Sequence, residues 1–342
     1  MTLLLTGAAG FIGSALTRAL VGRGDEKVVA LDRLGYAACP DALPAMDAPH
    51  VFVRADIRDG ATLDAVLGQH APRAIIHLAA ETHVDRSIDS PADFVEHNIV
   101  GTFQLLEAAR RHWQAQGHPD HFRFVHVSTD EVFGSLEADE PAFGPHSSYR
   151  PNSPYSASKA SSDHLARAWY ATYGLPVMVT NCSNNYGPWQ FPEKLMPLII
   201  QKALAGQPLP IYGDGGQRRD WLYVDDHAAG LMAALERGRP GGTYLFGAGH
   251  DQANIDVVRA LCDELDRQRP SPAGSYRRLI TFVADRPGHD RRYAIDAATT
   301  RAALDWAPRT DFTQGIAHTV RWCLENPDWA RRDYAGQRLG LG

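Results

Sequence analysis

The feature that most constrains the fold of this chain is the glycine-rich stretch that follows its first apolar segment. Residues 2–6 have the pattern of a buried strand, and Gly7, Gly10 and Gly13 follow at three-residue spacing before an apolar helical pattern begins. The first glycine permits a tight turn, the second lets the backbone approach a pyrophosphate, and the third allows close helix packing. The stretch therefore predicts the strand, turn and helix that open a dinucleotide-binding fold.

A second predicted strand, over residues 28–31, ends at Asp32. A carboxylate at this position binds the ribose hydroxyls of NAD, and its charge repels the additional phosphate of NADP. Arg33 is the counter-indication, because an arginine beside this carboxylate can bind that phosphate. On balance, the sequence favours NAD as the cofactor.

Strands and helices alternate through the first half of the chain, with further strands expected at residues 51–55, 74–78, 124–127 and 177–180. This alternation indicates a doubly wound parallel sheet. After residue 180 the alternation loosens and prolines and aromatic residues become more frequent. We expect a Rossmann-type α/β domain over residues 1–180, completed by later segments near 218–245, and a smaller C-terminal α/β substrate domain over 181–342.

Composition and charge exclude several classes of function. A net charge of -6 without a long basic run argues against nucleic acid as the partner. We find no signal peptide and no apolar run long enough to cross a bilayer. The four cysteines lack metal-binding or disulfide spacing, and His83 with Asp85 offers too few ligands for a metal. We therefore expect a cytoplasmic protein without a metal.

The strongest chemical signature flanks a proline-rich loop. Asp130 and Glu131 follow the strand at 124–127, and Tyr155 and Lys159 are four positions apart on a predicted helix, so they share one face. Lys159 is expected to lower the pKa of Tyr155 and make the phenol a base. Because adjacent carboxylates in a confined site resist double ionisation, one is expected to act as an acid and the other as a base. Either pair alone is usually a surface pair, but the glycine loop favours the chemical interpretation.

Together these motifs resemble the extended short-chain dehydrogenase/reductase family, and within it the dTDP-glucose 4,6-dehydratases. Related epimerases and decarboxylases share the glycine loop and the tyrosine-lysine pair, but are not expected to carry Thr-Asp-Glu here. Departures are mild, at Ala8, Thr82 and the pair Trp189-Gln190. The resemblance covers nearly the whole chain, and its most specific segments are HLAAETHVDRSI (77–88), STDEVFG (128–134), YSASKA (155–160), NCSNNYGP (181–188), FPEKL (191–195) and RDWLYVD (219–225).

The resemblance implies a lyase that uses bound NAD to convert dTDP-glucose to dTDP-4-keto-6-deoxyglucose. Tyr155 would remove the proton of the 4-hydroxyl as hydride leaves C4, with Lys159 holding the tyrosinate and Thr129 the 4-oxygen. Glu131 would then abstract H5, and Asp130 would protonate the departing 6-hydroxyl before hydride returns to C6. The catalytic residues would be Thr129, Asp130, Glu131, Tyr155 and Lys159.

By the same resemblance, cofactor contacts are expected from Gly7, Gly10, Phe11, Ile12, Gly13, Asp32, Arg33, Asp56, Ile57, Leu78, Ala79, Ala80, Thr82, Tyr155, Lys159 and Asn185. Contacts with the nucleotide sugar are expected from Thr82, Thr129, Asp130, Glu131, Asn184, Lys194, Leu195, Pro210, Ile211, Tyr212, Arg219, Asn254, Asp285, Arg286, Pro287, Gly288 and His289.

Three alternatives stay open at this point. The chain can be an NAD-dependent nucleotide-sugar 4-epimerase, a 4,6-dehydratase acting on another NDP-glucose, or a non-catalytic nucleotide-binding regulator. The sequence does not distinguish thymidine from uridine, and it does not say whether rhamnose or another deoxysugar is the end product. Two predicted helices, near residues 91–113 and 155–173, are expected to pair across a twofold axis and form a homodimer.

Overall fold

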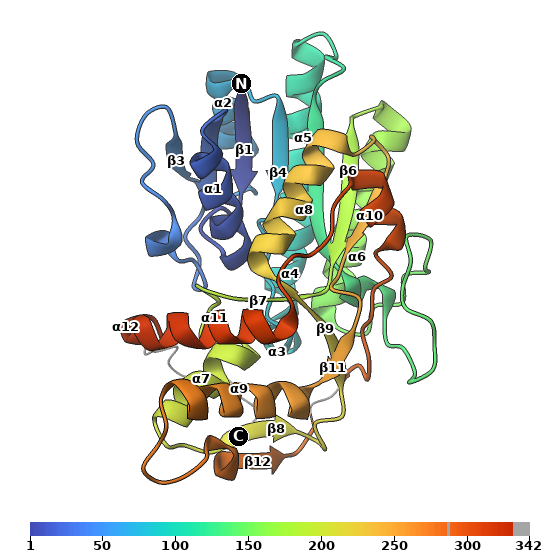
Figure 1. The fold of residues 1–342 in the computed structure, drawn as a ribbon. Helices are drawn as coiled ribbons and strands as arrows, with labels where there is room; N and C mark the ends of the chain where they lie inside the picture. The colour runs from blue at the N-terminus through green and yellow to red at the C-terminus, as the bar shows by residue number, and fades with distance from the viewer. Residues whose placement is uncertain (286–287, 331–342) are drawn as a thin grey trace.

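The larger part of the molecule is built on a sheet of seven strands that all run parallel (Figure 1). The structure is a computed structural model, and it describes residues 1–285 and 288–330. The strands of this sheet are β1 (Thr2–Thr6), β2 (Lys27–Asp32), β3 (Val51–Arg54), β4 (Ala74–His77), β5 (Arg123–Thr129), β6 (Val177–Cys182) and β10 (Thr243–Phe246). Their order is β10-β6-β5-β4-β1-β2-β3, so the winding reverses between β1 and β4. The predicted doubly wound sheet is confirmed.

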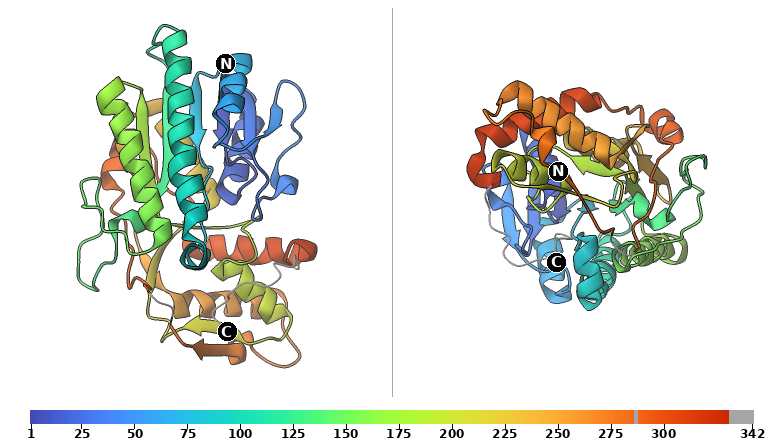
Figure 2. Two further views of the ribbon diagram at one scale, coloured as in Figure 1. Left: turned by 180° about the vertical axis from the view of Figure 1, so that it is seen from behind. Right: turned by 90° about the horizontal axis from the view of Figure 1, so that it is seen from below.

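Helices cover both faces of this sheet. The layer on one face consists of α1 (Phe11–Arg23), α8 (Val224–Arg237) and α10 (Ala298–Leu304), and the layer on the other of α2 (Gly60–His70), α5 (Gly101–Ala115) and α6 (Pro154–Tyr173). The layer that contains α5 and α6 faces the viewer in the left view of Figure 2.

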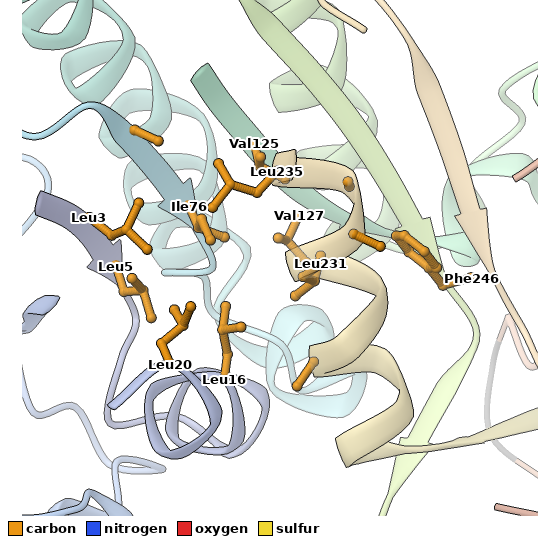
Figure 3. Close-up of a cluster of buried hydrophobic side chains, with 14 of the residues drawn as sticks. Leu3, Leu5, Leu16, Leu20, Ile76, Val125, Val127, Leu231, Leu235 and Phe246 are labelled. Carbon is orange, nitrogen blue, oxygen red and sulfur yellow. The ribbon is translucent and has the colours of Figure 1, made fainter. Parts of the chain in front are cut away.

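The strands are apolar on both sides because each face of the sheet is covered. Leu3 and Leu5 of β1 lie in one buried cluster with Leu16 of α1 and Leu231 of α8 (Figure 3). Leu4, between them, points to the opposite face and joins a second buried cluster with residues of α2, α5 and α6. The near-continuous apolar runs of the sequence are therefore central strands of a sandwiched sheet.

The single helix expected over residues 91–113 is interrupted. The chain forms α3 (Val84–Asp89), α4 (Pro91–Phe94) and a π-helical segment, η2 (Val95–Val100), before α5 begins. The wider turn of η2 leaves His97 and Asn98 buried. Such π-helical turns occur frequently at functional sites.

The smaller part of the molecule packs below the carboxyl ends of the large sheet (Figure 1). Its strands are β7 (Asn184–Tyr186), β9 (Arg218–Tyr223) and β11 (Asp251–Ala253) in one sheet, and β8 (Leu209–Tyr212) with β12 (Ile280–Val283) in another. Its helices are α7 (Leu195–Leu204), α9 (Asn254–Gln268), α11 (Phe312–Glu325) and α12 (Pro327–Ala330), and it contains the 3-10 turn η4 (Tyr276–Leu279). Two further 3-10 turns, η1 (Pro40–Ala42) and η3 (Asp130–Phe133), follow strands β2 and β5 of the large sheet.

The two parts are not consecutive in the chain. After β6 the chain enters the smaller part, and it returns to the large sheet with α8 and β10. The last strand of the large sheet thus lies well beyond residue 180. Among the described residues, we find no helix with the length and apolarity that a membrane crossing requires.

Candidate active site

A cavity of about 310 Å³ opens at the carboxyl ends of the central strands, where the strand order reverses. Open α/β sheets bind their ligands at this position. All residues predicted to contact the cofactor line the cavity, and so do the five predicted catalytic residues. The fold thus brings together at one site residues as far apart in the sequence as Gly7 and Asn185.

The glycine turn between β1 and α1 forms one wall of the cavity. Gly7 has φ +70°, and a Cβ atom there would lie 2.6 Å from the backbone nitrogen of Ala79. A Cβ atom on Gly13 would lie 2.0 Å from the carbonyl oxygen of Gly7. Only glycine fits at both positions, and the close packing directs the amino terminus of α1 at the cavity.

Asp32, the last residue of β2, also lines the cavity. Its Oδ2 accepts a hydrogen bond from the Ala9 nitrogen at 3.0 Å, and its Oδ1 accepts one from the Leu34 nitrogen at 2.7 Å. Burial raises the pKa of this carboxyl, and the two backbone donors act against that shift. The bonds fix the carboxylate at the strand end, where a ribose would lie.

Several buried polar atoms of the cavity have no hydrogen-bond partner among the described residues. They include Oδ2 of Asp130, Oγ of Ser183 and Oδ1 of Asn184. Buried polar groups in folded proteins are almost always paired, so these three atoms indicate a polar ligand. With the glycine turn and Asp32, they make the cavity a good fit for a dinucleotide next to a hydroxyl-rich substrate.

Tyr155 and Lys159 are positioned by the start of α6. Ser153 and Ser156 form a reciprocal capping box with both hydrogen bonds at 3.0 Å, and Pro154 occupies the first helical turn. The helix therefore begins directly before Tyr155, and Lys159 lies one turn later on the same side. Both side chains are buried.

The carboxylate pair is positioned by the end of β5. Its last residue, Thr129, donates a hydrogen bond to Asp130 Oδ1 at 3.3 Å and accepts one from the Glu131 nitrogen at 3.3 Å. Asp130 is buried, and burial followed by the neighbouring Glu131 raises its pKa well above the usual range. Burial therefore favours the neutral form of Asp130, which is the form that can donate a proton.

The predicted effect of Lys159 on Tyr155 is wrong for the structure as it stands. Burial, followed by the charge of Glu131, raises the pKa of Tyr155 well above that of a free phenol, while a hydrogen bond with Thr129 acts in the opposite direction. Lys159 Nζ instead donates to the carbonyl oxygen of Val127 at 2.9 Å. The helical spacing gave the shared face correctly, but it contained no information on desolvation or on Glu131.

Comparisons with known proteins agree with this geometry. A family model described as GDP-mannose 4,6 dehydratase matches residues 4–319. The dTDP-glucose 4,6-dehydratase of Escherichia coli is 51% identical over 100% of this chain and 99% of its own length. That of Xanthomonas campestris is 53% identical over 99% of both chains. The chain belongs to the dTDP-glucose 4,6-dehydratase family.

Solved structures of this dehydratase family have the same fold. The dTDP-glucose 4,6-dehydratase of Streptomyces venezuelae, crystallised with NAD and TYD, superposes with a TM-score of 0.88 at 42% identity, covering 96% of this chain and 98% of that one. A UDP-glucose 4-epimerase from Thermus thermophilus, in complex with NAD, has a TM-score of 0.83 at 29% identity over 94% and 98% of the two chains. The fold is thus common to dehydratases and epimerases.

The substrate residues predicted from the dehydratase motifs fall into two groups. Thr82, Asn184 and Lys194 line the cavity with the catalytic residues. A second group lies in the smaller part, where Asp285 is 2.6 Å from His289 Nδ1 and the rings of His289 and Tyr212 are 5.9 Å apart. The remaining members are Leu195 at the start of α7, Pro210 and Ile211 on β8, Asn254 at the start of α9, and Gly288, while Arg286 and Pro287 lie outside the described residues.

Arg219 of β9 connects the two groups. Its guanidinium donates to the carbonyl oxygen of Asp290 at 2.9 Å and lies 4.2 Å from the ring centre of Tyr293. Its charge also acts on Asp130, where it opposes the rise in pKa. Arg219 is therefore close to the acid of the carboxylate pair.

Several residues of the cavity were missed by sequence reasoning. Glu81 and His97 contact Arg33, and Tyr36 donates a hydrogen bond to Glu193 at 2.9 Å. The two halves of each contact are far apart in sequence, so no local spacing reveals them. Glu81 and Glu193 each fall within one of the dehydratase motifs, which is the signal that could have found them.

Proposed function

We propose that this protein is an NAD-dependent dTDP-glucose 4,6-dehydratase that forms dTDP-4-keto-6-deoxyglucose. The observation that carries the proposal is the pair formed by buried Asp130 and partly buried Glu131, in a cavity that Tyr155, the glycine turn and Asp32 also line. A base, an acid and a phenol around one hexose can perform oxidation and water loss in sequence. The sequence identity of 51% to 53% with named dehydratases over full length supports the same activity.

The first step is oxidation of the sugar at C4. Tyr155 accepts the proton of the 4-hydroxyl, and Thr129, whose side chain reaches both Tyr155 and Asp130, hydrogen-bonds the 4-oxygen. Lys159 lies one helical turn from the phenol on the same side of α6, where it would hold the nicotinamide ribose. When bound, NAD would supply the hydride acceptor for C4 and, once reduced, the hydride donor for C6.

The second step is loss of water across C5 and C6. A ketone at C4 makes H5 acidic, and Glu131 removes it as a base. Asp130, protonated because it is buried beside Glu131, gives its proton to the departing 6-hydroxyl. The adjacent carboxylates therefore perform two proton transfers of opposite direction, one from C5 and one to the 6-hydroxyl oxygen.

The cofactor would be held by residues of the large sheet. The amino terminus of α1 and its glycine turn would bind the pyrophosphate, and Asp32 would bind the ribose hydroxyls. We propose that residues 1–180, with α8 and β10, form the cofactor domain and that the other described residues after 180 form mainly the domain that binds the nucleotide sugar. Arg219, Tyr212 and Asn254 are the proposed contacts of that second region.

The product mass tests this function directly. The pure protein, incubated with dTDP-glucose without added NAD, is expected to release a nucleotide sugar lighter by one water, as measured by mass spectrometry. A product of unchanged mass with inverted C4 would identify a 4-epimerase instead, and bound but unchanged dTDP-glucose would identify a regulator. Turnover of UDP-glucose in parallel measures the preference for thymidine.

We further propose that two copies associate through α5 and α6. These helices lie side by side on one face of the sheet (Figure 2), with the rings of Phe103 and Trp169 at 5.9 Å. Val95, Phe103, Tyr170 and Tyr173 are all exposed in the isolated chain. Such an apolar patch is typical of a subunit interface, and one patch pairing with itself generates a closed dimer.

The dimer is tested by the variant Phe103→Glu. The wild-type chain is expected to sediment at twice the chain mass, and the variant at the mass of one chain, because a charge at the centre of an apolar interface is left unpaired. Phe282→Glu is the matched control, since Phe282 is exposed on β12 in the other part of the molecule. A wild-type monomer would contradict the proposal.

We also propose a cytoplasmic location. All four cysteines lie within the described residues and are buried, and none forms a disulfide. Cysteines that stay reduced are typical of the reducing cytoplasm.

A further inference from the structure

Arg33 lies in a cluster that the proposed mechanism does not use. It follows Asp32 at the end of β2, Glu81 follows β4, and His97 lies in the π-helical segment η2. Nη1 of Arg33 is 2.6 Å from Nε2 of His97, and Nη2 forms an ion pair with Glu81 Oε1. All three residues line the cavity, so three separate elements meet at the end where the ribose hydroxyls would bind Asp32.

Both partners of the Arg33 guanidinium accept a hydrogen bond from it. His97 Nδ1 lies 2.7 Å from the carbonyl oxygen of Asp93, which can only accept, so Nδ1 carries the hydrogen. Nε2 of the neutral ring is then a bare acceptor for the Arg33 guanidinium. Each terminal nitrogen of Arg33 is therefore directed at an acceptor of the protein itself.

Glu81 is held in place to make its contact. Its backbone nitrogen donates to Asn98 Oδ1 at 2.8 Å, and its carbonyl oxygen accepts from Asn98 Nδ2 at 2.9 Å. Its side chain is only 13% exposed, against 35% for that of Arg33. Glu81 is thus a fixed, partly buried carboxylate, and its charge is close enough to Asp32 to raise the pKa of that carboxyl.

We propose that Glu81 is a second determinant of dinucleotide specificity, which acts by engaging the guanidinium that would otherwise bind the 2′-phosphate of NADP. Arginine beside the acidic residue of this fold is the usual partner of that phosphate. In this chain, Glu81 neutralises Arg33 and adds a negative charge near Asp32, whereas the 2′-phosphate would bring a charge of about -1.5 to -2. The inference depends on the proposed use of NAD.

The experiment measures which dinucleotide the protein retains, independently of turnover. Each purified protein is exchanged against equal excesses of NAD and NADP, freed of unbound nucleotide and denatured, and the released dinucleotides are quantified. Wild type is expected to retain NAD. Glu81→Gln is expected to raise the ratio of NADP to NAD by about 10-fold, the effect of gaining one charge-assisted contact to a phosphate.

Two comparisons separate this role from a structural one. Glu81→Asp keeps the charge and is expected to keep the wild-type ratio of NADP to NAD. The double variant Asp32→Ser with Glu81→Gln is expected to have a higher ratio of NADP to NAD than Asp32→Ser alone. Glu26→Gln, which breaks an ion pair with Arg73 outside the cavity, is the matched control and is expected to change nothing.

An unchanged ratio in Glu81→Gln, or a proportional loss of both nucleotides, would overturn the role of Glu81. If wild type retains neither nucleotide, the proposed use of NAD fails as well. If wild type retains NAD while every Glu81 variant keeps its ratio, only the specificity role fails.

Discussion

Replacing Glu131 with glutamine is expected to lower the rate of dehydration by roughly 100- to 10,000-fold, the contribution typical of a positioned base. The amide keeps the size of the side chain but cannot accept H5. In deuterium oxide, wild-type product is expected to carry deuterium at C5, because the proton that Glu131 removes is replaced from solvent. The recovered sugar nucleotide of the variant is expected to carry none. Mass spectrometry with proton NMR measures both results.

Asp130→Asn provides the matched comparison. Asparagine cannot supply the proton that the departing hydroxyl needs, so water loss is expected to fall while Glu131 still exchanges H5. Recovered dTDP-glucose is then expected to be labelled at C5. The assignment of the two roles would be contradicted if Glu131→Gln labelled C5 or if the two variants behaved alike.

Replacing Tyr155 with phenylalanine is expected to have an effect of similar size at an earlier step. Without the phenol oxygen the 4-hydroxyl keeps its proton, so no ketone forms and H5 does not become acidic. A loss of roughly 100- to 10,000-fold is expected. Neither water loss nor deuterium at C5 should be detected, which separates this variant from Asp130→Asn.

A matched tyrosine serves as the control for this experiment. Tyr276 is also buried and donates its hydroxyl to the carbonyl oxygen of Arg269, but it lies in the smaller part. Tyr276→Phe is therefore expected to retain near wild-type rates. Labelling of C5 by Tyr155→Phe would show that oxidation proceeds without the phenol and would reject its role.

The parts of this structure that were predictable from the sequence depend on local patterns. The glycine turn, Asp32 and the tyrosine-lysine spacing each follow from a few neighbouring residues, and the structure brings them to one cavity. The strands were found because a sheet covered on both faces has continuous apolar runs. The end of β6 was placed two residues too early, because Asn181 and Cys182 are polar or small although they are buried strand residues.

What sequence reasoning missed depends on contacts between distant segments. The pKa of Tyr155 is governed by burial and by Glu131, which comes from the other end of the proline-rich loop. Glu81 and His97 meet Arg33 only because β2, β4 and η2 converge. No periodicity within one element encodes such convergence, and the π-helical turn that buries His97 has no established sequence pattern of its own.

The late return of the chain to the large sheet has a consequence for its synthesis. The apolar face of the large sheet that packs against Leu231 and Leu235 of α8 stays partly uncovered until α8 has been synthesised, and β6 has no neighbour on its outer side until β10 follows. A nascent chain in this state exposes an unpaired strand edge and an apolar surface. Chaperones recognise such features, and they promote aggregation. The glycine turn between β1 and α1 is thus among the first segments synthesised, and α8, which packs against α1, is among the last.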